Sequence, residues 1–153
     1  MRTLLTALTC IPLPQLQRRL LEHFYRQHGS RMRANGEGEL WVARADEIVG
    51  GMSLQAEADG HWLTGLFVAP QWRGRQVASR LVEAALTARP GPTWLFCHPD
   101  LEGFYQRLGF TPTSDLPEAL ASRLARYQRS KPLLAMTRGQ SSATSRPGNS
   151  TSV

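Results

Sequence analysis

The fold is decided by the stretch Leu66-Phe67-Val68-Ala69-Pro70-Gln71-Trp72-Arg73-Gly74-Arg75-Gln76-Val77-Ala78-Ser79-Arg80-Leu81. Its first three residues continue an apolar run that starts at Trp62, which predicts a buried strand. Pro70 ends that strand, because proline cannot donate a hydrogen bond to a sheet. From Val77 the apolar residues recur at helical spacing, which predicts a helix over 77–88. The stretch therefore predicts a strand, a loop and the start of a helix.

The loop in this stretch is suited to an anionic ligand. Gly74 permits a tight turn or a close approach of the backbone to a ligand. The first amides of the helix offer free N–H groups and a partial positive charge. Arg73 and Arg75 add full positive charges at the same place. We expect a phosphate-bearing ligand here, and the alternative is an ordinary strand–loop–helix connection with exposed arginines.

The composition limits the class of protein. The chain has 153 residues, enough for one domain with its own core. No apolar run approaches the about 18 residues that span a bilayer. The apolar start of the chain is short and broken by Thr6 and Thr9, which favours a strand over a signal peptide. Two cysteines, Cys10 and Cys97, give no disulfide framework, so we expect a reducing, cytoplasmic location.

The net charge is +6 at pH 7, and nearly all of the positive charge is arginine because Lys131 is the one lysine. Such an excess suits anionic ligands, acidic proteins or nucleic acid. The chain has no run of five like charges, no zinc-finger spacing and no repeat, so we prefer dispersed surface charge to a nucleic-acid footprint. Arg31 and Arg33 lie in a polar loop over 30–39 and are candidates to contact an acidic acceptor, or are simply solvated.

Periodicity and turn residues predict the remaining elements. A helix is predicted at 15–28, with Leu16, Leu20 and Phe24 recurring every four residues and Leu13 and Leu21 beside them. A second is predicted at 99–108, with a further helical face near the C-terminus. Strands are predicted at 3–11, 40–44, 48–55, 61–68, 93–97 and 131–136, with a bulge at Gly50 and Gly51. Because a helix connects 61–68 to 93–97, these two strands should be parallel, with a ligand cleft at their C-terminal ends.

The run Phe104-Tyr105-Gln106-Arg107-Leu108-Gly109-Phe110 closes the helix that follows the second parallel strand. This run and the 66–81 stretch resemble motifs B and A of the GNAT N-acetyltransferase superfamily. Arg73 and Ala78 fit the first and last positions of motif A, Gln/Arg-x-x-Gly-x-Gly/Ala, whereas Gln76 replaces its second glycine. The two motifs occur in the right order and at about the right distance. The resemblance covers about residues 1–137 and is strongest over 61–112.

The resemblance implies an α/β fold with a mixed, mostly antiparallel central sheet, helices on both faces, and a splayed parallel strand pair that forms the cofactor cleft. It also implies acetyl-CoA as cosubstrate. The implied cofactor-binding residues are Leu66, Phe67, Val68, Arg73, Gly74, Arg75, Gln76, Val77, Ala78 and Ser79. We expect an acetyltransferase domain over 1–137, followed by a tail over 138–153 whose polar composition predicts disorder.

The implied reaction transfers acetyl from acetyl-CoA to a primary amine by direct attack. The resemblance makes Tyr105 the general acid for the departing thiolate and the Val68 amide the donor to the developing oxyanion. The alternative for Tyr105 is an aromatic core pair with Phe104. Residues 62–68 contain no carboxylate to act as base. The nearby options are Glu57, Asp59, His61 and His98. His98 follows the second parallel strand and an ordinary histidine pKa of about 6.5 suits a base, but a lone histidine there is more often a helix-capping or loop residue.

Other functions stay open at this level. A non-catalytic acetyl-CoA-binding regulator would explain Gln76 and the missing carboxylate. A basic nucleic-acid-binding module is a further alternative. The acceptor can be a small amine, an amino acid, a peptide N-terminus or a lysine side chain, and the sequence is compatible with a homodimer.

Overall fold

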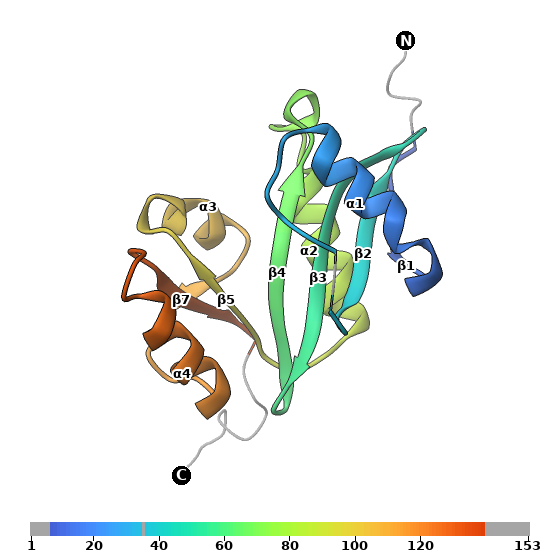
Figure 1. The fold of residues 1–153 in the computed structure, drawn as a ribbon. Helices are drawn as coiled ribbons and strands as arrows, with labels where there is room; N and C mark the ends of the chain where they lie inside the picture. Colours follow the sequence, from blue (N-terminus) through green and yellow to red (C-terminus); the bar gives the residue numbers. More distant parts are fainter. Residues whose placement is uncertain (1–6, 35, 140–153) are drawn as a thin grey trace. The chain divides into compact units, whose positions relative to one another are not determined.

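The computed structural model describes residues 7–34 and 36–139, and Figure 1 shows the course of the chain. The helices and strands are β1 (Thr9–Leu13), η2 (Gln15–Gln17), α1 (Arg18–Gln27), β2 (Glu39–Arg44), β3 (Ile48–Glu57), β4 (Gly60–Val68), η3 (Pro70–Trp72), α2 (Val77–Ala88), β5 (Thr93–Cys97), η4 (Pro99–Leu101), α3 (Glu102–Arg107), β6 (Thr111–Pro112), α4 (Glu118–Tyr127) and β7 (Leu134–Arg138). The strand order is β1-β2-β3-β4-β5-β7-β6. The sheet is mostly antiparallel with one parallel pair, β4 and β5, as the sequence predicts.

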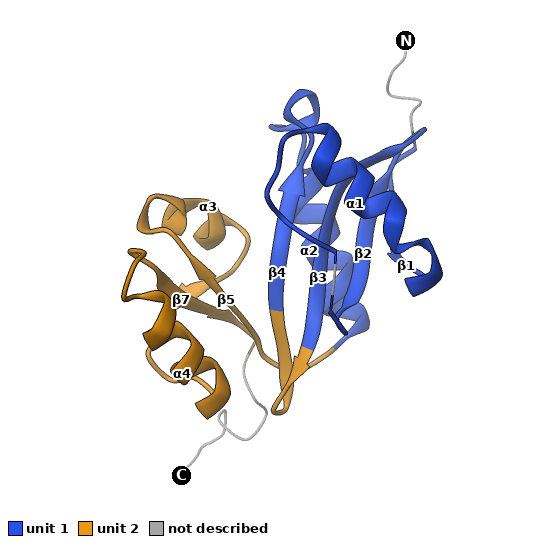
Figure 2. Ribbon diagram, in the orientation of Figure 1, with its two compact units in different colours: residues 1–55, 63–89 blue, residues 56–62, 90–153 orange. Residues whose placement is uncertain are grey.

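The chain divides into two compact units, which Figure 2 colours separately. Unit 1 consists of residues 1–55 and 63–89, and unit 2 of residues 56–62 and 90–153. Strand β4 therefore begins in unit 2 and ends in unit 1. The parallel pairing lies within unit 2, where His61 is opposite Thr93 and Trp62 is opposite Trp94.

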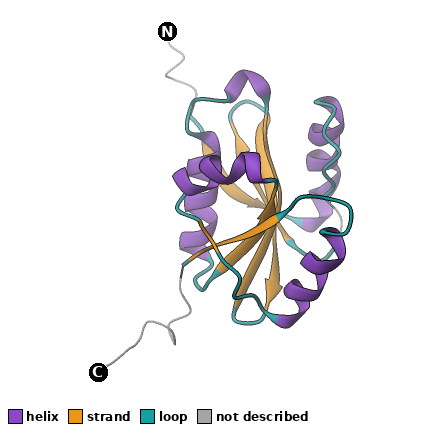
Figure 3. Ribbon diagram, turned by 90° about the vertical axis from the view of Figure 1, so that its left-hand side faces the viewer, coloured by secondary structure: helices purple, strands orange, loops and turns teal. Residues whose placement is uncertain are grey.

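In unit 1, helices α1 and α2 cover opposite faces of the strands: in Figure 1 α1 lies in front of them and α2 behind, and the side view in Figure 3 shows helices on both sides of strands. Two adjacent glycines of β3 allow this close packing. A Cβ at Gly50 would lie 3.3 Å from a methyl of Val77 in α2, and a Cβ at Gly51 would overlap Leu21 in α1. Successive strand residues point to opposite faces, so Gly50 leaves room for α2 on one face and Gly51 leaves room for α1 on the other.

The predicted bulge at these glycines is wrong by one residue. Gly50 pairs with Ala43 and Gly51 with Val42, whereas the register shifts between Ala43 and Arg44. Since Arg44 is opposite Ile48, the extra residue is Val49. The glycines are therefore explained by helix packing and not by the bulge.

The predicted apolar face of the first helix is confirmed for Phe24 and for the neighbouring Leu13 and Leu21, which are buried, and is wrong for Leu16 and Leu20. The helical region starts with the short turn η2, and Leu16 and Leu20 are 98% and 46% exposed. The buried residues of α1 are Leu21, Phe24 and Tyr25. Their i, i+3, i+4 spacing is an alternative stripe in the same sequence, and it is the one that faces the strands.

The two ends of the domain are shifted from the prediction. Strand β1 includes Pro12, which is tolerated because β1 is an edge strand that pairs with β2 alone. Residues 3–6 of the predicted first strand lie outside the described residues. Strand β7 extends to Arg138, so this residue belongs to the sheet and not to the predicted tail. Residues 140–153 of that tail lie outside the described residues.

Unit 2 has its own apolar cluster beneath its strands. Trp62, Trp94 and Leu120 are buried, with Phe96 and Leu116 packed against them. Within residues 7–34 and 36–139, no helix combines the length and the apolar character needed to cross a membrane.

Candidate active site

A backbone hydrogen bond fixes the residue that follows β4 to the neighbouring strand β3 of unit 1. The buried Ala69 donates its N–H to the carbonyl of Val49 at 2.8 Å. The turn η3 follows, with the N–H of Trp72 donating to the carbonyl of Ala69 at 2.8 Å. The loop therefore starts from a fixed point on the sheet.

The loop then takes two left-handed residues to reach α2. Gly74 has φ +80° and Gln76 has φ +66° with ψ +19°. Gly74 is exposed, and a Cβ there would have no heavy atom within 4 Å. Gln76 is the N-cap residue of α2, and its side chain makes no capping hydrogen bond. A non-glycine residue in this conformation is uncommon and costs about 1–2 kcal/mol.

The start of α2 presents backbone donors next to this turn. The N–H of Arg80 donates to the carbonyl of Gln76 at 2.9 Å, which closes the first helical turn. The amides of Val77, Ala78 and Ser79 precede that bond, so they have no acceptor within the helix. Backbone N–H groups and the helix dipole together favour an anion at this position.

The two arginines of the loop fold back onto it. Arg73 donates its Nε–H to the carbonyl of Val68 at 2.9 Å, and its guanidinium lies 5.1 Å from the ring centre of Phe67. The guanidinium of Arg75 lies 5.1 Å from the ring centre of Trp72. No carboxylate occurs in the sequence between Asp59 and Glu83, so no neighbouring residue in this segment neutralises these charges.

Helix α1 packs on the strand end that leads into the loop. The ring of Phe67 lies 5.8 Å from that of Phe24 and 6.2 Å from that of His28. The buried Tyr25 donates its hydroxyl to the carbonyl of Gly65 at 2.6 Å, and burial raises the pKa of that hydroxyl. Gly65 has φ +70°, so β4 bends here and Tyr25 holds the bend.

In unit 2, Tyr105 of α3 lies in an aromatic setting. Its ring centre is 5.0 Å from that of Phe104 and 6.1 Å from that of Phe110. Burial, with a smaller contribution from Cys97, raises the pKa of Tyr105 to about 12. The hydroxyl therefore keeps its proton at neutral pH, as a general acid must. Helix α3 ends at Arg107, and Gly109, two residues later, has φ +94°.

His98 and Cys97 follow β5 in the same unit. The Nδ1 of His98 accepts the N–H of Asp100 at 3.0 Å and thereby caps the turn η4. When Nδ1 accepts, neutral histidine carries its proton on Nε2, so His98 would have to give up this cap to accept a proton. Cys97 is buried with its sulfur 3.7 Å from that of Met136, and burial and the charge of Glu102 raise the pKa of its thiol. It is an inert strand cysteine.

A sequence profile of the acetyltransferase (GNAT) domain matches residues 36–112, which is half of the chain. The chain belongs to the GNAT acetyltransferase family. Over 81 residues it is 40% identical to the peptidyl-lysine N-acetyltransferase YjaB of Salmonella typhimurium. That match covers 50% of this chain and 53% of the relative, so the chain spans about half the length of the curated relative it matches.

Solved GNAT structures share the fold. The ribosomal-protein-S18-alanine N-acetyltransferase of Escherichia coli superposes with a TM-score of 0.65 at 15% identity, covering 94% of this chain and 100% of that one. A GNAT acetyltransferase of Staphylococcus aureus gives 0.64 at 16% identity, with 86% and 98% covered. The N-acetylglutamate synthase of Neisseria gonorrhoeae, solved with coenzyme A and N-acetyl-glutamate, gives 0.62 at 19% identity, with 86% and 35% covered.

The structure thus places the predicted residues of this GNAT chain in two groups. Leu66 to Val68 and Arg73 to Ser79 lie together in unit 1, on β4, the loop and the start of α2. Tyr105 and His98 lie in unit 2, on α3 and at the end of β5. Sequence reasoning missed the bond between Tyr25 and Gly65. A glycine inside an otherwise apolar strand was the available signal.

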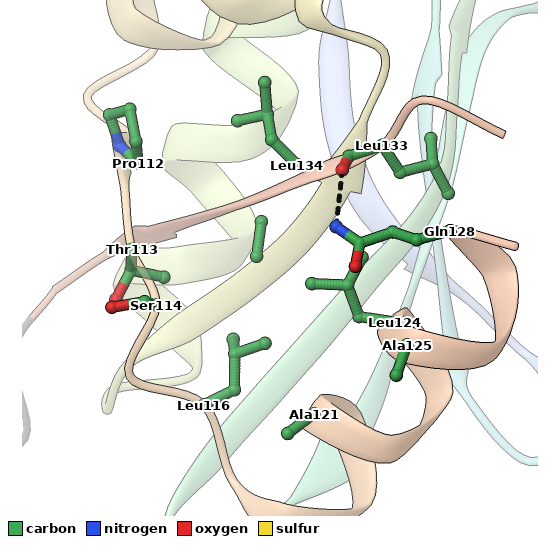
Figure 4. Close-up of a pocket in the computed structure, with 11 residues that line it drawn as sticks. Pro112, Thr113, Ser114, Leu116, Ala121, Leu124, Ala125, Gln128, Leu133 and Leu134 are labelled. Atoms are coloured by element: carbon green, nitrogen blue, oxygen red, sulfur yellow. Dashed lines mark hydrogen bonds between the residues drawn. The ribbon is translucent and has the colours of Figure 1, made fainter.

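A groove of about 490 Å³ lies elsewhere in unit 2, along β6, β7 and α4 (Figure 4). Its lining is largely apolar, including Leu116, Leu124 and Leu134, and Gln128 donates to the carbonyl of Leu133 at 2.9 Å across one side. None of the predicted site residues lines it. Among the described residues, no group of three His, Cys, Asp or Glu side chains could hold a metal ion.

Proposed function

We propose that the protein is an N-acetyltransferase that uses acetyl-CoA and a primary amine. The observation that carries this proposal is the loop before α2 in a chain of the GNAT family. There, the left-handed Gln76 leads directly into a helix start with free amides. Arg73 and Arg75 supply positive charge, with no carboxylate in the surrounding segment.

The residues of the loop fit the pyrophosphate of acetyl-CoA. The amides of Val77, Ala78 and Ser79 would donate to its oxygens, and Arg73 and Arg75 would balance its charge. Gln76 already has the left-handed backbone that glycine adopts readily, and this supports the motif despite the substitution. The backbone of Leu66 to Val68 would hold the pantetheine arm, as the family resemblance implies.

Acetyl-CoA supplies an acetyl group activated as a thioester. The amine nitrogen forms a bond to the carbonyl carbon, and the carbon–sulfur bond breaks. The Val68 amide would donate to the carbonyl oxygen as negative charge develops there. The Tyr105 hydroxyl would pass its proton to the departing sulfur, and its raised pKa favours the protonated form that this role needs. The amine must first lose a proton, because an ordinary lysine has a pKa of about 10.4.

The first acceptor to test is a lysine side chain of a peptide, because the printed name of the Salmonella relative specifies peptidyl-lysine. We also propose that the protein works in the cytoplasm. Cys10 and Cys97 are both free thiols, as expected in a reducing compartment. The homodimer stays a prediction.

A second candidate is a regulator that binds acetyl-CoA without transferring the acetyl group. It is favoured by the absence of a carboxylate in residues 60–68 and by the use of His98 Nδ1 as a cap. Both observations leave the reaction without an evident base.

The test combines binding and turnover on the purified protein. Acetyl-CoA is titrated calorimetrically, and acetylation of a panel of peptides and small amines is followed by mass spectrometry. Acetyl transfer above the rate without protein supports the enzyme. Binding without transfer to any amine supports the regulator, and the absence of binding refutes both.

A further inference from the structure

The end of α1 lies next to the strand residue that the proposed reaction uses. Phe24 and His28 both pack on Phe67, and Phe67 precedes Val68, whose amide we assign to the carbonyl oxygen. The segment that follows α1 therefore leaves the helix beside the reacting end of β4, within unit 1.

This segment is anchored at both ends. The N–H of Ser30 donates to the carbonyl of Tyr25 at 2.9 Å, and the Ser30 hydroxyl accepts the N–H of Met32 at 3.1 Å. Ala34 is 2% exposed and belongs to the core cluster that contains Tyr25. Between these anchors Arg31 and Arg33 are exposed. Two cations are thus presented to solvent from a fixed backbone.

No ion pair among the described residues involves the arginines of this region. Arg26, at the end of α1, is exposed as well, and the sequence has no carboxylate between Glu22 and Glu37. In the described part of the chain the ion pair between two permanently charged groups joins Arg89 to Glu39, and His98 lies near the Asp100 carboxylate at 3.5 Å. Neither contact involves Arg26, Arg31 or Arg33.

Four other arginines of unit 1 have contacts within the fold. Arg73 and Arg75 lie on aromatic rings, Arg80 donates to the carbonyl of Leu8 at 3.0 Å, and Arg89 pairs with Glu39. The three arginines after Phe24 make no such contact among the described residues. Three like charges within eight residues of sequence repel one another to the extent that they are close in space, and a partner of opposite charge relieves that repulsion.

We propose that the acceptor is an acidic peptide segment, in which carboxylates close to the reacting amine bind Arg26, Arg31 and Arg33. This inference rests on the proposed acetyltransferase function and names its substrate class. A peptide is favoured over a free acidic amino acid, because three arginines spread over eight residues outnumber the two carboxylates that one acidic amino acid carries. Arginine suits this role because its planar guanidinium binds carboxylates in a bidentate manner.

The test compares three peptides that differ only beside their single lysine, with glutamate, glutamine or arginine at the flanking positions. A free acidic amino acid serves as a fourth acceptor. For the natural protein at low salt, we expect kcat/KM to be about tenfold higher for the glutamate peptide than for the glutamine peptide. This ratio should shrink in 0.5 M salt, where charges are screened within about 4 Å.

Two variants with equal loss of charge locate the effect. Arg31→Gln with Arg33→Gln should reduce the glutamate-to-glutamine ratio to about one. Arg18→Gln with Arg19→Gln lies at the other end of α1, roughly 13 Å from Gln27 along the helix axis, and should keep the ratio. Both pairs are exposed, so neither change removes core packing.

The outcomes separate the two proposals. Equal kcat/KM for all three peptides overturns the acidic acceptor and leaves the acetyltransferase standing. A preference for the free amino acid over every peptide overturns the peptide segment. Loss of oligonucleotide binding in the Arg31 and Arg33 variant, without a peptide preference in the natural protein, assigns the charge to nucleic acid instead. No transfer to any acceptor refutes the acetyltransferase and this inference with it.

Discussion

The left-handed backbone at Gln76 predicts an inverted response to glycine. We consider Gln76→Gly and Gln76→Ala, and as a control Thr87→Gly and Thr87→Ala. Thr87 is an exposed residue within α2. In an ordinary helical conformation, glycine is less stable than alanine by about 1 kcal/mol. At φ +66°, alanine keeps a steric cost that glycine does not have.

The magnitude follows from two opposing contributions. The left-handed conformation costs a residue with a Cβ about 1–2 kcal/mol. Glycine avoids this cost but loses about 0.5–1 kcal/mol through the greater freedom of the unfolded chain. We therefore expect Gln76→Gly to be more stable than Gln76→Ala by about 0.5–1 kcal/mol. At Thr87 the difference should have the opposite sign.

The assay is urea unfolding followed by far-ultraviolet circular dichroism. With a slope of about 2 kcal/mol/M, the two Gln76 variants should differ by about 0.3–0.5 M in their midpoints. A Gln76→Gly protein that is less stable than Gln76→Ala by the amount seen at Thr87 would refute the assigned backbone. The acetyl-CoA affinity of Gln76→Gly should equal or exceed that of the natural protein, and its loss would show that the glutamine side chain itself binds.

Three further predictions concern the tyrosines. Tyr105→Phe should lower kcat about 100-fold while the Kd for acetyl-CoA changes less than about threefold, and an unchanged kcat would remove Tyr105 from the reaction. The pKa of Tyr105 in the folded protein is raised from 10.0 to about 12, so its contribution to stability is complete below pH 10 and is lost as the pH rises towards 12. Between these pH values the unfolding free energy of Tyr105→Phe should therefore fall less steeply than that of the natural protein. Parallel curves of unfolding free energy against pH for the two proteins would contradict the raised pKa. Tyr25→Phe leaves the carbonyl of Gly65 without its 2.6 Å hydrogen bond and should destabilise the protein by about 1–2 kcal/mol, whereas an unchanged midpoint of thermal unfolding would contradict the role of this bond.

Local signals in the sequence predicted the elements that carry the loop. Helix α2 begins at Val77 and ends at Ala88 as predicted, because the glycine loop and Pro90 mark its two ends. Strand β5 also has the predicted bounds. In both cases the apolar pattern and the turn residues agree, so a single interpretation is available.

The predictions failed where two interpretations of the same residues compete. The first helix contains one stripe through Leu16 and Leu20 and another through Leu21 and Tyr25, and only packing on the strands selects between them. The glycines of β3 suggest a bulge locally, but their cause is the pair of helices on opposite faces.

In the candidate site, too, local features were predictable from the sequence and contacts between distant residues were not. The turn at Gly74 and the start of α2 were predictable, because they are built from consecutive residues. The bend at Gly65 and its bond to Tyr25 join residues that are 40 positions apart, and no local pattern encodes that contact. The capping of η4 by His98 was one of two roles that the sequence allowed.

The proposed function requires the loop before α2 to hold the pyrophosphate of acetyl-CoA. The most direct test is calorimetric titration of acetyl-CoA into the natural protein, Gly74→Asn and Gly74→Asp. Gly74 is left-handed with open space around it, and asparagine and aspartate both tolerate this conformation, so the two variants differ mainly in charge. We predict a micromolar Kd for the natural protein and at least about tenfold weaker binding by Gly74→Asp than by Gly74→Asn. No binding by the natural protein at millimolar acetyl-CoA, or equal affinities of the two variants, would contradict the account.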